Sequence, residues 1–437
     1  MPETLFCAID FGTSNSAVAV PDGGAMCLVE LEPGFRTMPT AVFYPGEPDA
    51  RDRHAVPPCE FGRAAISAYV DGIDGRLMRS MKSILGSSLV EQTTDVGGGR
   101  GVRYLDVVTT YLRHLRALAE RASGGPIDRA VLGRPVFFVD DDPERDARAQ
   151  AALLEAAHAA GFRAVEFQYE PIAAAFDHEQ AVTHEENVLV ADIGGGTSDF
   201  SLVRVGPERM KRHDRKGDIL ANHGVHIAGT DFDRRVELAA ILPLLGYGAL
   251  GPADDGTPAR EVPSAVYFDL ATWHLINTVY NPQRVVELRA MRSFYADPVQ
   301  HRRLMTVVTE HYGHDLAARA EAAKIAVAGG GTTTIALEHV EPGLVAGLDE
   351  AATLRALDGD LERIVEAART TVAQAGLVGG KVDALYLTGG STGLDVLSAR
   401  LHAAFPAARV VRGDRFASVA TGLALFAQRR FGGSARR

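Results

Sequence analysis

The sequence predicts an α/β protein made of two related halves, and two observations carry this prediction. One pattern occurs twice, at residues 8–16 and 191–199: an apolar run, an Asp, a turn of Gly, Thr and Ser, and a second β-like run. Elsewhere, segments typical of strands alternate with segments of helical periodicity, which is the pattern of α/β folds. A chain of 437 residues is long for one domain and sufficient for two lobes around a cleft. We expect lobe I at residues 1–185 and lobe II at residues 186–437.

The first lobe is expected to alternate strands and helices around one insert. The predicted strands lie at residues 5–9, 17–20, 130–133 and 164–168, and the predicted helices at residues 62–70, 77–85, 105–121, 142–160 and 170–180. Asp142 and Pro143 favour a helix start, because Asp caps a first turn and Pro is tolerated in it. Residues 37–104 are rich in Pro, Gly and short polar pieces, and we expect them to form an inserted subdomain.

The second lobe repeats this plan with a longer insert. Its predicted strands lie at residues 187–191, 200–205 and 384–388, and its predicted helices after Asp233 and at residues 321–328, 394–404 and 418–430. Residues 246–318 are mixed in character and are expected to be irregular. We expect an inserted subdomain at about 228–345 and a last helix that returns towards lobe I.

Composition excludes some classes of partner. The 45 basic and 56 acidic residues give a net charge of −11, which argues against nonspecific binding to nucleic acid. The three cysteines have no spacing typical of a metal or redox site. The N-terminus lacks the basic region of a signal peptide, and we find no apolar stretch of membrane-spanning length. We therefore expect a cytoplasmic protein without nucleic-acid or membrane partners.

The two repeated turns have the residues of a phosphate-binding site. Gly12 and the triplet Gly194, Gly195 and Gly196 let the backbone approach a ligand closely. Successive amides in such a turn form an anion-binding concavity, to which Thr and Ser hydroxyls add donors. A single copy is equally typical of a tight hairpin turn. Two copies, each with an Asp at the strand exit, favour phosphate binding.

Four carboxylates are candidates for the chemistry. Asp10 and Asp192 are expected to face each other across the cleft and to hold a hydrated Mg²⁺, which takes few direct protein ligands; each could instead cap its own turn. Asp199 is a further candidate, or the solvent-facing start of the next strand. Glu170 precedes Pro171 at a strand-to-helix junction, where it can orient a water or metal, or stabilise the helix N-terminus.

Two further segments are candidates for nucleoside contacts. Gly389, Gly390 and Ser391 lie between a predicted strand and a predicted helix, which places them at a helix N-terminus that can bind a phosphate or nucleoside. Glu321 and Lys324 share one helical face, where a solvated ion pair is the simpler interpretation.

These segments together resemble the nucleotide-binding domain of the seventy-kilodalton heat-shock chaperones (the DnaK type), within the actin, hexokinase and chaperone ATPase superfamily. The matching segments occur in the family's order over essentially the whole chain: residues 9–16, 170–175, 192–199, 229–233, 321–325 and 389–392. Residues 161–171 and 243–246 are similar to a bacterial, chaperone-like subgroup of the YegD type.

The resemblance implies a two-lobed actin-like ATPase fold, built from duplicated ribonuclease-H-like domains with inserted subdomains. It implies binding of ATP or ADP with Mg²⁺, slow hydrolysis that switches lobe closure, and protein clients or a co-chaperone as partners. The catalytic residues that it implies are Asp10, Glu170, Asp192, Thr197 and Asp199, with Asp10 and Asp192 holding the metal mainly through water. The nucleotide contacts that it implies are Gly12, Thr13, Ser14, Asn15, Gly194, Gly195, Gly196, Gly229, Glu321, Lys324, Gly389, Gly390 and Ser391.

The chain departs from the family pattern at several positions. Ile66 stands where the family has its catalytic Lys, and Lys82 is the nearby candidate to replace that cation. Gly393 stands where the family stacks an Arg on adenine, and Ala328 replaces a Ser of the adenosine helix. Residues 234–320 form a longer segment than the family's equivalent. Because the chain ends at residue 437, we expect no peptide-binding domain.

Three functions follow as hypotheses. The first is a slow, Mg-dependent ATPase that acts as a chaperone-related conformational switch. The second is a nucleotide sensor or scaffold without hydrolysis, because loss of a cation at the γ-phosphate removes charge stabilisation from the transition state. The third is a small-molecule kinase of the same superfamily.

Overall fold

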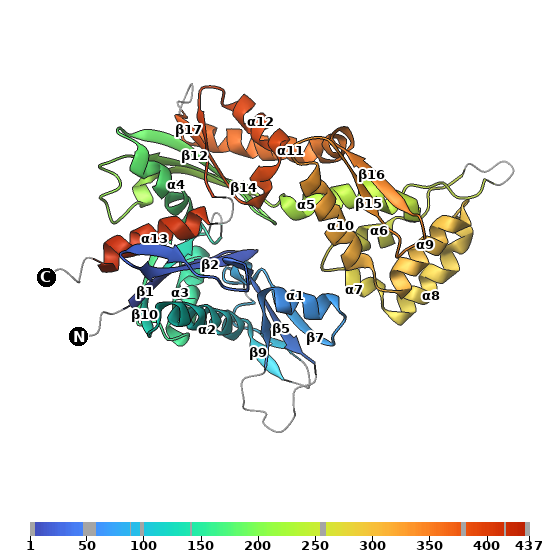
Figure 1. Cartoon of the computed structure of the whole chain (residues 1–437), viewed down its shortest axis with the longest axis horizontal. Coiled ribbons are helices and arrows are strands. Elements are labelled where there is room, and N and C mark those ends of the chain that lie inside the picture. Colours follow the sequence, from blue (N-terminus) through green and yellow to red (C-terminus); the bar gives the residue numbers. More distant parts are fainter. Residues whose placement is uncertain are drawn as a thin grey trace.

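Two sheets of equivalent topology organise the molecule, as Figure 1 shows. The structure is a computed structural model and describes residues 5–46, 58–87, 89–96, 100–139, 142–253, 259–376, 382–414 and 417–432. The first sheet contains β1 (Leu5–Phe11), β2 (Asn15–Asp22), β3 (Ala25–Leu28), β10 (Ile127–Arg134) and β11 (Ala164–Tyr169), with β4 (Thr37–Pro39) beside β2. The second contains β12 (Glu186–Ile193), β13 (Ser198–Val205), β14 (Ile219–Val225), β17 (Ala384–Thr388) and β18 (Arg409–Arg412).

The strand orders are the same in both sheets. The first runs β3-β2-β1-β10-β11 and the second β14-β13-β12-β17-β18. In each, a hairpin and a third antiparallel strand are followed by two parallel strands. The repeated sequence pattern therefore marks two sheets of one topology, each with its Asp-bearing turn at the tip of the central hairpin.

Helices cover the two outer faces of the sheets. α2 (Tyr104–Ser123) and α3 (Pro143–Ala159) share a core with the first sheet, and α11 (Glu350–Gln374) and α12 (Asp395–Ala404) share one with the second. Strands covered on both faces need apolar side chains in both directions. This need explains the nearly continuous burial of β1 and β12.

Two helices form a layer between the sheets. α4 (Glu170–Ala181) and α13 (Ser418–Phe431) share one core with apolar residues of both sheets, and Figure 1 shows them between the two sheets, at the left of the view. The two helices pack at Gly422, where a Cβ would lie 1.8 Å from the carbonyl oxygen of Ala173. Only glycine allows the backbones to approach so closely.

The first insert is a small sheet with one helix. It contains β5 (Ala41–Pro45), β6 (Glu60–Phe61), α1 (Gly62–Val70), β7 (Gly75–Arg79), the 3₁₀ helix η1 (Met81–Ile84), β8 (Thr93–Asp95) and β9 (Gly101–Arg103). The helix predicted at residues 77–85 is wrong. Leu77 and Met78 pair with β5, and Ser80 has a left-handed conformation (φ 53°) that ends the strand before η1 begins. A strand end and a short 3₁₀ turn together gave a helix-like apolar spacing.

The second insert has a core of its own, with Leu242, Tyr267 and Leu304 at its centre. It contains α5 (Gly229–Val236), the π turn η3 (Glu237–Ile241), η4 (Leu242–Leu245), α6 (Ala265–Leu270), α7 (Ile276–Val279), α8 (Pro282–Ala290), η5 (Met291–Phe294), α9 (Pro298–Thr309), α10 (Gly313–Ala326), β15 (Thr332–Ala336) and β16 (Val345–Asp349).

The expectation of irregular structure at residues 246–318 is also wrong, because much of this segment is helical. Most of its helices have too few turns to show a clear periodicity in sequence. Asn281 and Asp297 cap α8 and α9, each directly before a proline. Within the described residues, we find no helix with the length and apolar character needed to cross a membrane.

Candidate functional site

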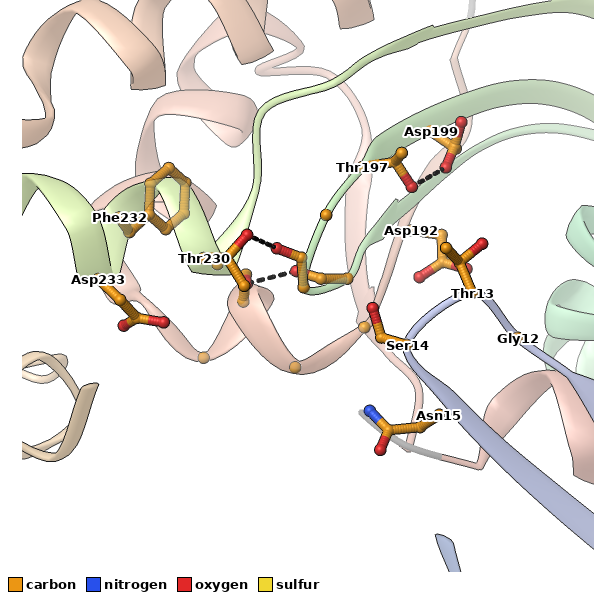
Figure 2. A pocket seen from close by; sticks show the side chains of 18 of the residues that line it. Gly12, Thr13, Ser14, Asn15, Asp192, Thr197, Asp199, Thr230, Phe232 and Asp233 are labelled. Atoms are coloured by element: carbon orange, nitrogen blue, oxygen red, sulfur yellow. Dashed lines mark hydrogen bonds between the residues drawn. The ribbon is translucent and has the colours of Figure 1, made fainter. Parts of the chain in front are cut away.

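One cavity of about 600 Å³ lies where the β1–β2 and β12–β13 turns approach each other. The cavity brings together every residue that the sequence assigned to the site, and their roles stay predictions. They are Asp10, Gly12, Thr13, Ser14, Asn15, Glu170, Asp192, Gly194, Gly195, Gly196, Thr197, Asp199, Gly229, Glu321, Lys324, Gly389, Gly390 and Ser391. Figure 2 shows the first turn facing the second across this cavity.

Glycines permit the tight geometry of both turns. A Cβ on Gly12 would lie 2.3 Å from the carbonyl oxygen of Asn15. A Cβ on Gly195 would lie 3.1 Å from Oγ of Ser14, so the two turns are close neighbours across the cavity. The amide of Gly194 donates to the carbonyl oxygen of Thr197 at 3.0 Å, which closes the second turn. A ligand between the turns therefore meets backbone and hydroxyl groups from both halves of the chain.

Asp10 and Asp192 sit in an environment that disfavours two negative charges. Burial raises the pKa of Asp10, and the negative charge of Glu170 raises it further. Burial, Asp199 and Glu170 raise the pKa of Asp192 to about 7. Protein atoms surround both carboxyls, although the cavity leaves part of their surface open. Such a cluster binds a cation well, because the cation relieves the repulsion between the carboxylates.

The donor set fits a hydrated magnesium ion. Among the described residues, no group of three or more His, Cys, Asp or Glu side chains forms a metal cluster. Mg²⁺ keeps several waters and is commonly held by one or two carboxylates together with substrate phosphates. Asp10 and Asp192 would supply these carboxylates.

Asp199 is the second residue of β13 and lies opposite Asp192 in the hairpin register. The hydroxyl of Thr197 donates to Oδ2 of Asp199 at 2.8 Å, as Figure 2 shows. Desolvation by the surrounding protein raises the pKa of the Asp199 carboxyl, although the side chain is exposed to the open cavity, and this hydrogen bond acts in the opposite direction. Asp199 therefore belongs to the acidic end of the cavity rather than only to a solvent-facing strand.

Lys82 supplies a cation beside Asp10 and Glu170 in the cavity. Its ammonium group donates to Oε1 of Glu170, and the residue is only 7% exposed. Ile66, in contrast, packs against the small core of the first insert that contains Phe43 and Ala65. Lys82 lies in η1 directly after the left-handed Ser80, so the backbone turn at Ser80 directs this segment to the cavity.

Glu170 is the first residue of α4, and its hydrogen-bond partner in the described structure is Lys82 rather than an amide of its own helix. This contact favours a role in the cavity over a helix-capping role.

Two other segments donate hydrogen bonds to the carbonyl groups of the second turn. Oγ of Ser391 donates to the carbonyl oxygen of Gly194 at 2.7 Å, and Oγ1 of Thr230 donates to that of Gly195 at 2.8 Å. Gly389 has φ of +85°, and a Cβ there would lie 2.4 Å from the carbonyl oxygen of Ile193. The glycines and hydroxyls of these segments therefore fix the shape of the β12–β13 turn.

α10 (Gly313–Ala326) and the 3₁₀ helix η6 (Gly390–Gly393) form the end of the cavity that lies away from Asp10 and Asp192. Lys324 pairs with Asp233 at 2.6 Å, so the simple Glu321–Lys324 pair considered from the sequence is replaced by a contact to α5. Burial raises the pKa of Asp233 to about 6, against the effect of Lys324. Ile325, Ala328 and Gly393 line the same end.

Thr230 and Asp233 are two polar residues of the cavity that sequence reasoning missed. Both lie in the segment 229–233, whose match to the family motif was the available signal. The sequence signal for Lys82 was weaker and consisted of the rarity of lysine, which occurs only five times in the chain. Two of these lysines, Lys82 and Lys324, line the cavity.

The two inserts contact each other beside the cavity through Tyr69, Arg79, Trp273 and His314, which we call the insert contact. Tyr69 stacks on Trp273 with ring centroids 5.2 Å apart, and the Arg79 guanidinium lies 4.2 Å from the Trp273 centroid. The His314 ring lies 4.9 Å from that of Trp273. Figure 1 shows the two inserts on the same side of the molecule.

Comparison with known proteins gives a consistent picture. Residues 80–240 match the family model described as Hsp70 protein. A chaperone protein HscA homolog of Aromatoleum aromaticum is 32% identical over 250 residues, which are 53% of this chain and 36% of the relative. The chaperone proteins DnaK of Cyanophora paradoxa and Deinococcus deserti are each 29% identical, over 52% of this chain. The match thus spans about a third of the length of these relatives. Together, these findings show that part of this chain is similar to the Hsp70 family model and to chaperone proteins named HscA and DnaK.

Proposed function

We propose that the chain binds ATP with Mg²⁺ in this cavity and hydrolyses it slowly, as a chaperone-related conformational switch. The observation that carries the proposal is that two Asp-bearing glycine turns and Lys82 meet in a single cavity. Two turns with inward amides suit the anionic oxygens of a polyphosphate, and the carboxylates suit its metal. The printed names of the relatives are those of chaperones, which is consistent with this proposal.

Lys82 and Glu170 divide the catalytic work in this proposal. Lys82 stabilises the negative charge that develops on the terminal phosphate, the task otherwise expected of a Lys at position 66. Glu170, held by Lys82, accepts a hydrogen bond from the attacking water. The water oxygen bonds to the terminal phosphorus as the bond to the leaving ADP oxygen breaks, and the water proton passes through Glu170 to the released phosphate. Asp10 and Asp192 would hold a magnesium ion, which would supply positive charge to the phosphates.

Slow turnover follows from the same contact. Lys82 must serve both Glu170 and the phosphate, so part of its charge is already neutralised in the ligand-free protein. Glu321 and Lys324 on α10 would hold the sugar. The nucleotide would then join both inserts and both sheets, and its hydrolysis would change closure of the two lobes.

Titration calorimetry tests the binding step. We expect the wild-type chain to bind ATP in the presence of Mg²⁺, and the double variant Asp10→Ala with Asp192→Ala to lose metal-dependent binding. Asp22→Ala, at the far end of β2, is the matched control and should leave the affinity unchanged. Absence of ATP binding by wild type, or unchanged binding by the double variant, would overturn the proposal.

Ile66 favours a non-hydrolysing sensor as the second candidate, and single-turnover hydrolysis separates the two. Release of inorganic phosphate above the buffer rate supports the ATPase, and a rate equal to that of buffer supports the sensor. A phosphorylated metabolite among the products would instead identify a small-molecule kinase.

Several finer assignments belong to the same proposal. These are membership of the YegD-type subgroup, a two-lobed actin-like arrangement with a boundary near residue 185, cytoplasmic location, and clients or a co-chaperone as partners. A pull-down that compares the ATP-bound and ADP-bound chain would test the partners, because a switch should retain different proteins in its two states.

A further inference from the structure

We propose that the cavity accepts nucleoside triphosphates with different bases at similar affinity, with purines above pyrimidines. This inference rests on the proposed function and names the ligand class of the same site. The phosphates would occupy the end with the two turns. The base must then lie towards α10 and η6, at the end of the cavity where Ile325, Ala328, Gly393 and Leu394 are found.

Hydrocarbon surface dominates the base end. Ile325 is 61% exposed although it lines the cavity, so it presents a large apolar side chain that nothing in the described structure covers. Ala328 adds a methyl group, and Gly393 adds only backbone. A flat base can rest on this surface and remove it from water, which favours binding without reading the edge of the base.

The polar side chains at this end already have partners within the protein. Lys324 pairs with Asp233 at 2.6 Å and donates to the carbonyl oxygen of Gly229 at 3.3 Å. The Ser391 hydroxyl donates to the carbonyl oxygen of Gly194. Glu321 is the remaining charged side chain of this face, and as a carboxylate it suits the sugar hydroxyls, which all ribonucleotides share.

Two backbone amides that directly follow η6 are also engaged. The amide of Leu394 donates to the carbonyl oxygen of Ser391 at 3.2 Å, and that of Asp395 donates to Ala328 at 3.1 Å. These amides therefore lack a free hydrogen for the edge of a base.

Discrimination between bases needs groups that are left unsatisfied by the wrong ligand. A site that hydrogen-bonds its ligand can reject an analogue by about 10⁴-fold or more, whereas an apolar pocket discriminates by only about 10²-fold or less. With directional groups engaged elsewhere, adenine and guanine should differ little. Purines should exceed pyrimidines because their larger rings cover more of Ile325.

The experiment is titration calorimetry of the wild-type chain with ATP, GTP, CTP and UTP in the presence of Mg²⁺. We expect the Kd values for ATP and GTP to agree within about tenfold, and those for CTP and UTP to be weaker by about threefold to tenfold. A preference for one purine of about 100-fold or more would overturn the inference while leaving the proposed function intact. If none of the four binds, the proposed function itself fails.

Ile325→Ala tests the surface directly. Because this side chain is exposed, the variant should fold, and it should weaken all four nucleotides by a similar factor of about threefold to tenfold. Val286→Ala on α8 is the matched control, since Val286 is 64% exposed and is not a cavity residue. A change in the ATP-to-GTP ratio in Ile325→Ala would contradict the inference, because it would show that Ile325 distinguishes the bases.

Discussion

Single charged side chains have very different consequences in this molecule, depending on where they lie. Lys82 faces Glu170 in the cavity, Arg215 is fully buried with Glu179 and Asp218, and Lys211 is paired with Glu208 on the surface. Each forms an ion pair, but only the first lies where a ligand can use its charge. Their substitution should therefore separate function from stability.

Lys82→Ala should lower the rate of single-turnover ATP hydrolysis by about 10²-fold, because one stabilising charge at the developing transition state is lost. Its affinity for ATP should fall more than its affinity for ADP, since the terminal phosphate is the group that Lys82 contacts in our proposal. Lys211→Ala is the control, as its exposed pair has no cavity contact. Equal hydrolysis rates in Lys82→Ala and wild type would contradict the role of Lys82.

Arg215→Ala should destabilise the fold by about 3–5 kcal/mol, because it leaves Glu179 buried without its cation and removes one of two cations from Asp218, which keeps Arg209. Urea unfolding would measure this loss. Lys211→Ala should change the free energy of unfolding by less than about 1 kcal/mol, as is typical of a surface pair. Similar effects of the two variants would show that burial does not govern these ion pairs.

At the scale of elements, the packing of α4 against α13 depends on the absence of a side chain. Gly422→Ala would place a methyl group against the Ala173 carbonyl, and backbone cannot move aside as a flexible side chain does. We expect a loss of about 2–3 kcal/mol or more in the free energy of unfolding.

The same substitution in another helix is the control. Gly359 lies in the interior of α11, where a Cβ would have no heavy atom within 4 Å beyond its own helix backbone and chain neighbours. Gly359→Ala should therefore stabilise the protein by about 0.5–1 kcal/mol, because alanine is the better helix former. Destabilisation of the same size in both variants would disprove the steric explanation.

Elements with strong local signals could be predicted from sequence. The Asp142–Pro143 start of α3 is confirmed, since the Asp142 side chain accepts from the amide of Arg145, and α2 ends at the left-handed Gly124. The duplicated turns identified the cavity residues, because both turns carry their chemistry within a few consecutive positions.

The features that could not be predicted from sequence depend on contacts between residues that are distant in the chain. The short helices between residues 246 and 318 are stabilised by packing their apolar side chains into the core of the second insert. The position of Lys82 depends on the left-handed backbone of Ser80. Sequence does not indicate this conformation, because the residue is neither a glycine nor an asparagine. The pairing of Lys324 with Asp233 joins α10 to α5 across many residues of sequence.

For the whole molecule, the insert contact links the two inserts beside the cavity. Burial and then the charge of Arg79 lower the pKa of His314 to about 4. The groups that face His314 are Arg79 and Tyr69 of the first insert, and Trp273 and Asn277 of its own insert. Its neutral form is therefore the one that fits the contact.

Stability should fall as the pH decreases from about 6.5 to about 4 because of this histidine. The unfolded chain binds a proton at His314 in this range, whereas the folded chain does so only near the lower pKa, so protons favour the unfolded state. Urea unfolding at pH 7.5 and pH 5 would measure the effect by comparing wild type with His314→Gln. The variant should lose less stability between the two pH values, and an equal or larger loss would contradict the prediction.

The insert contact also contains Trp273, which is the only tryptophan in the sequence. Its indole ring is stacked on Tyr69 and covered by the Arg79 guanidinium, so its surroundings change whenever the two inserts separate. The intrinsic fluorescence of the unlabelled protein therefore reports on this one junction, without contributions from other tryptophans. Stopped-flow emission after mixing with nucleotide would follow opening and closing in real time.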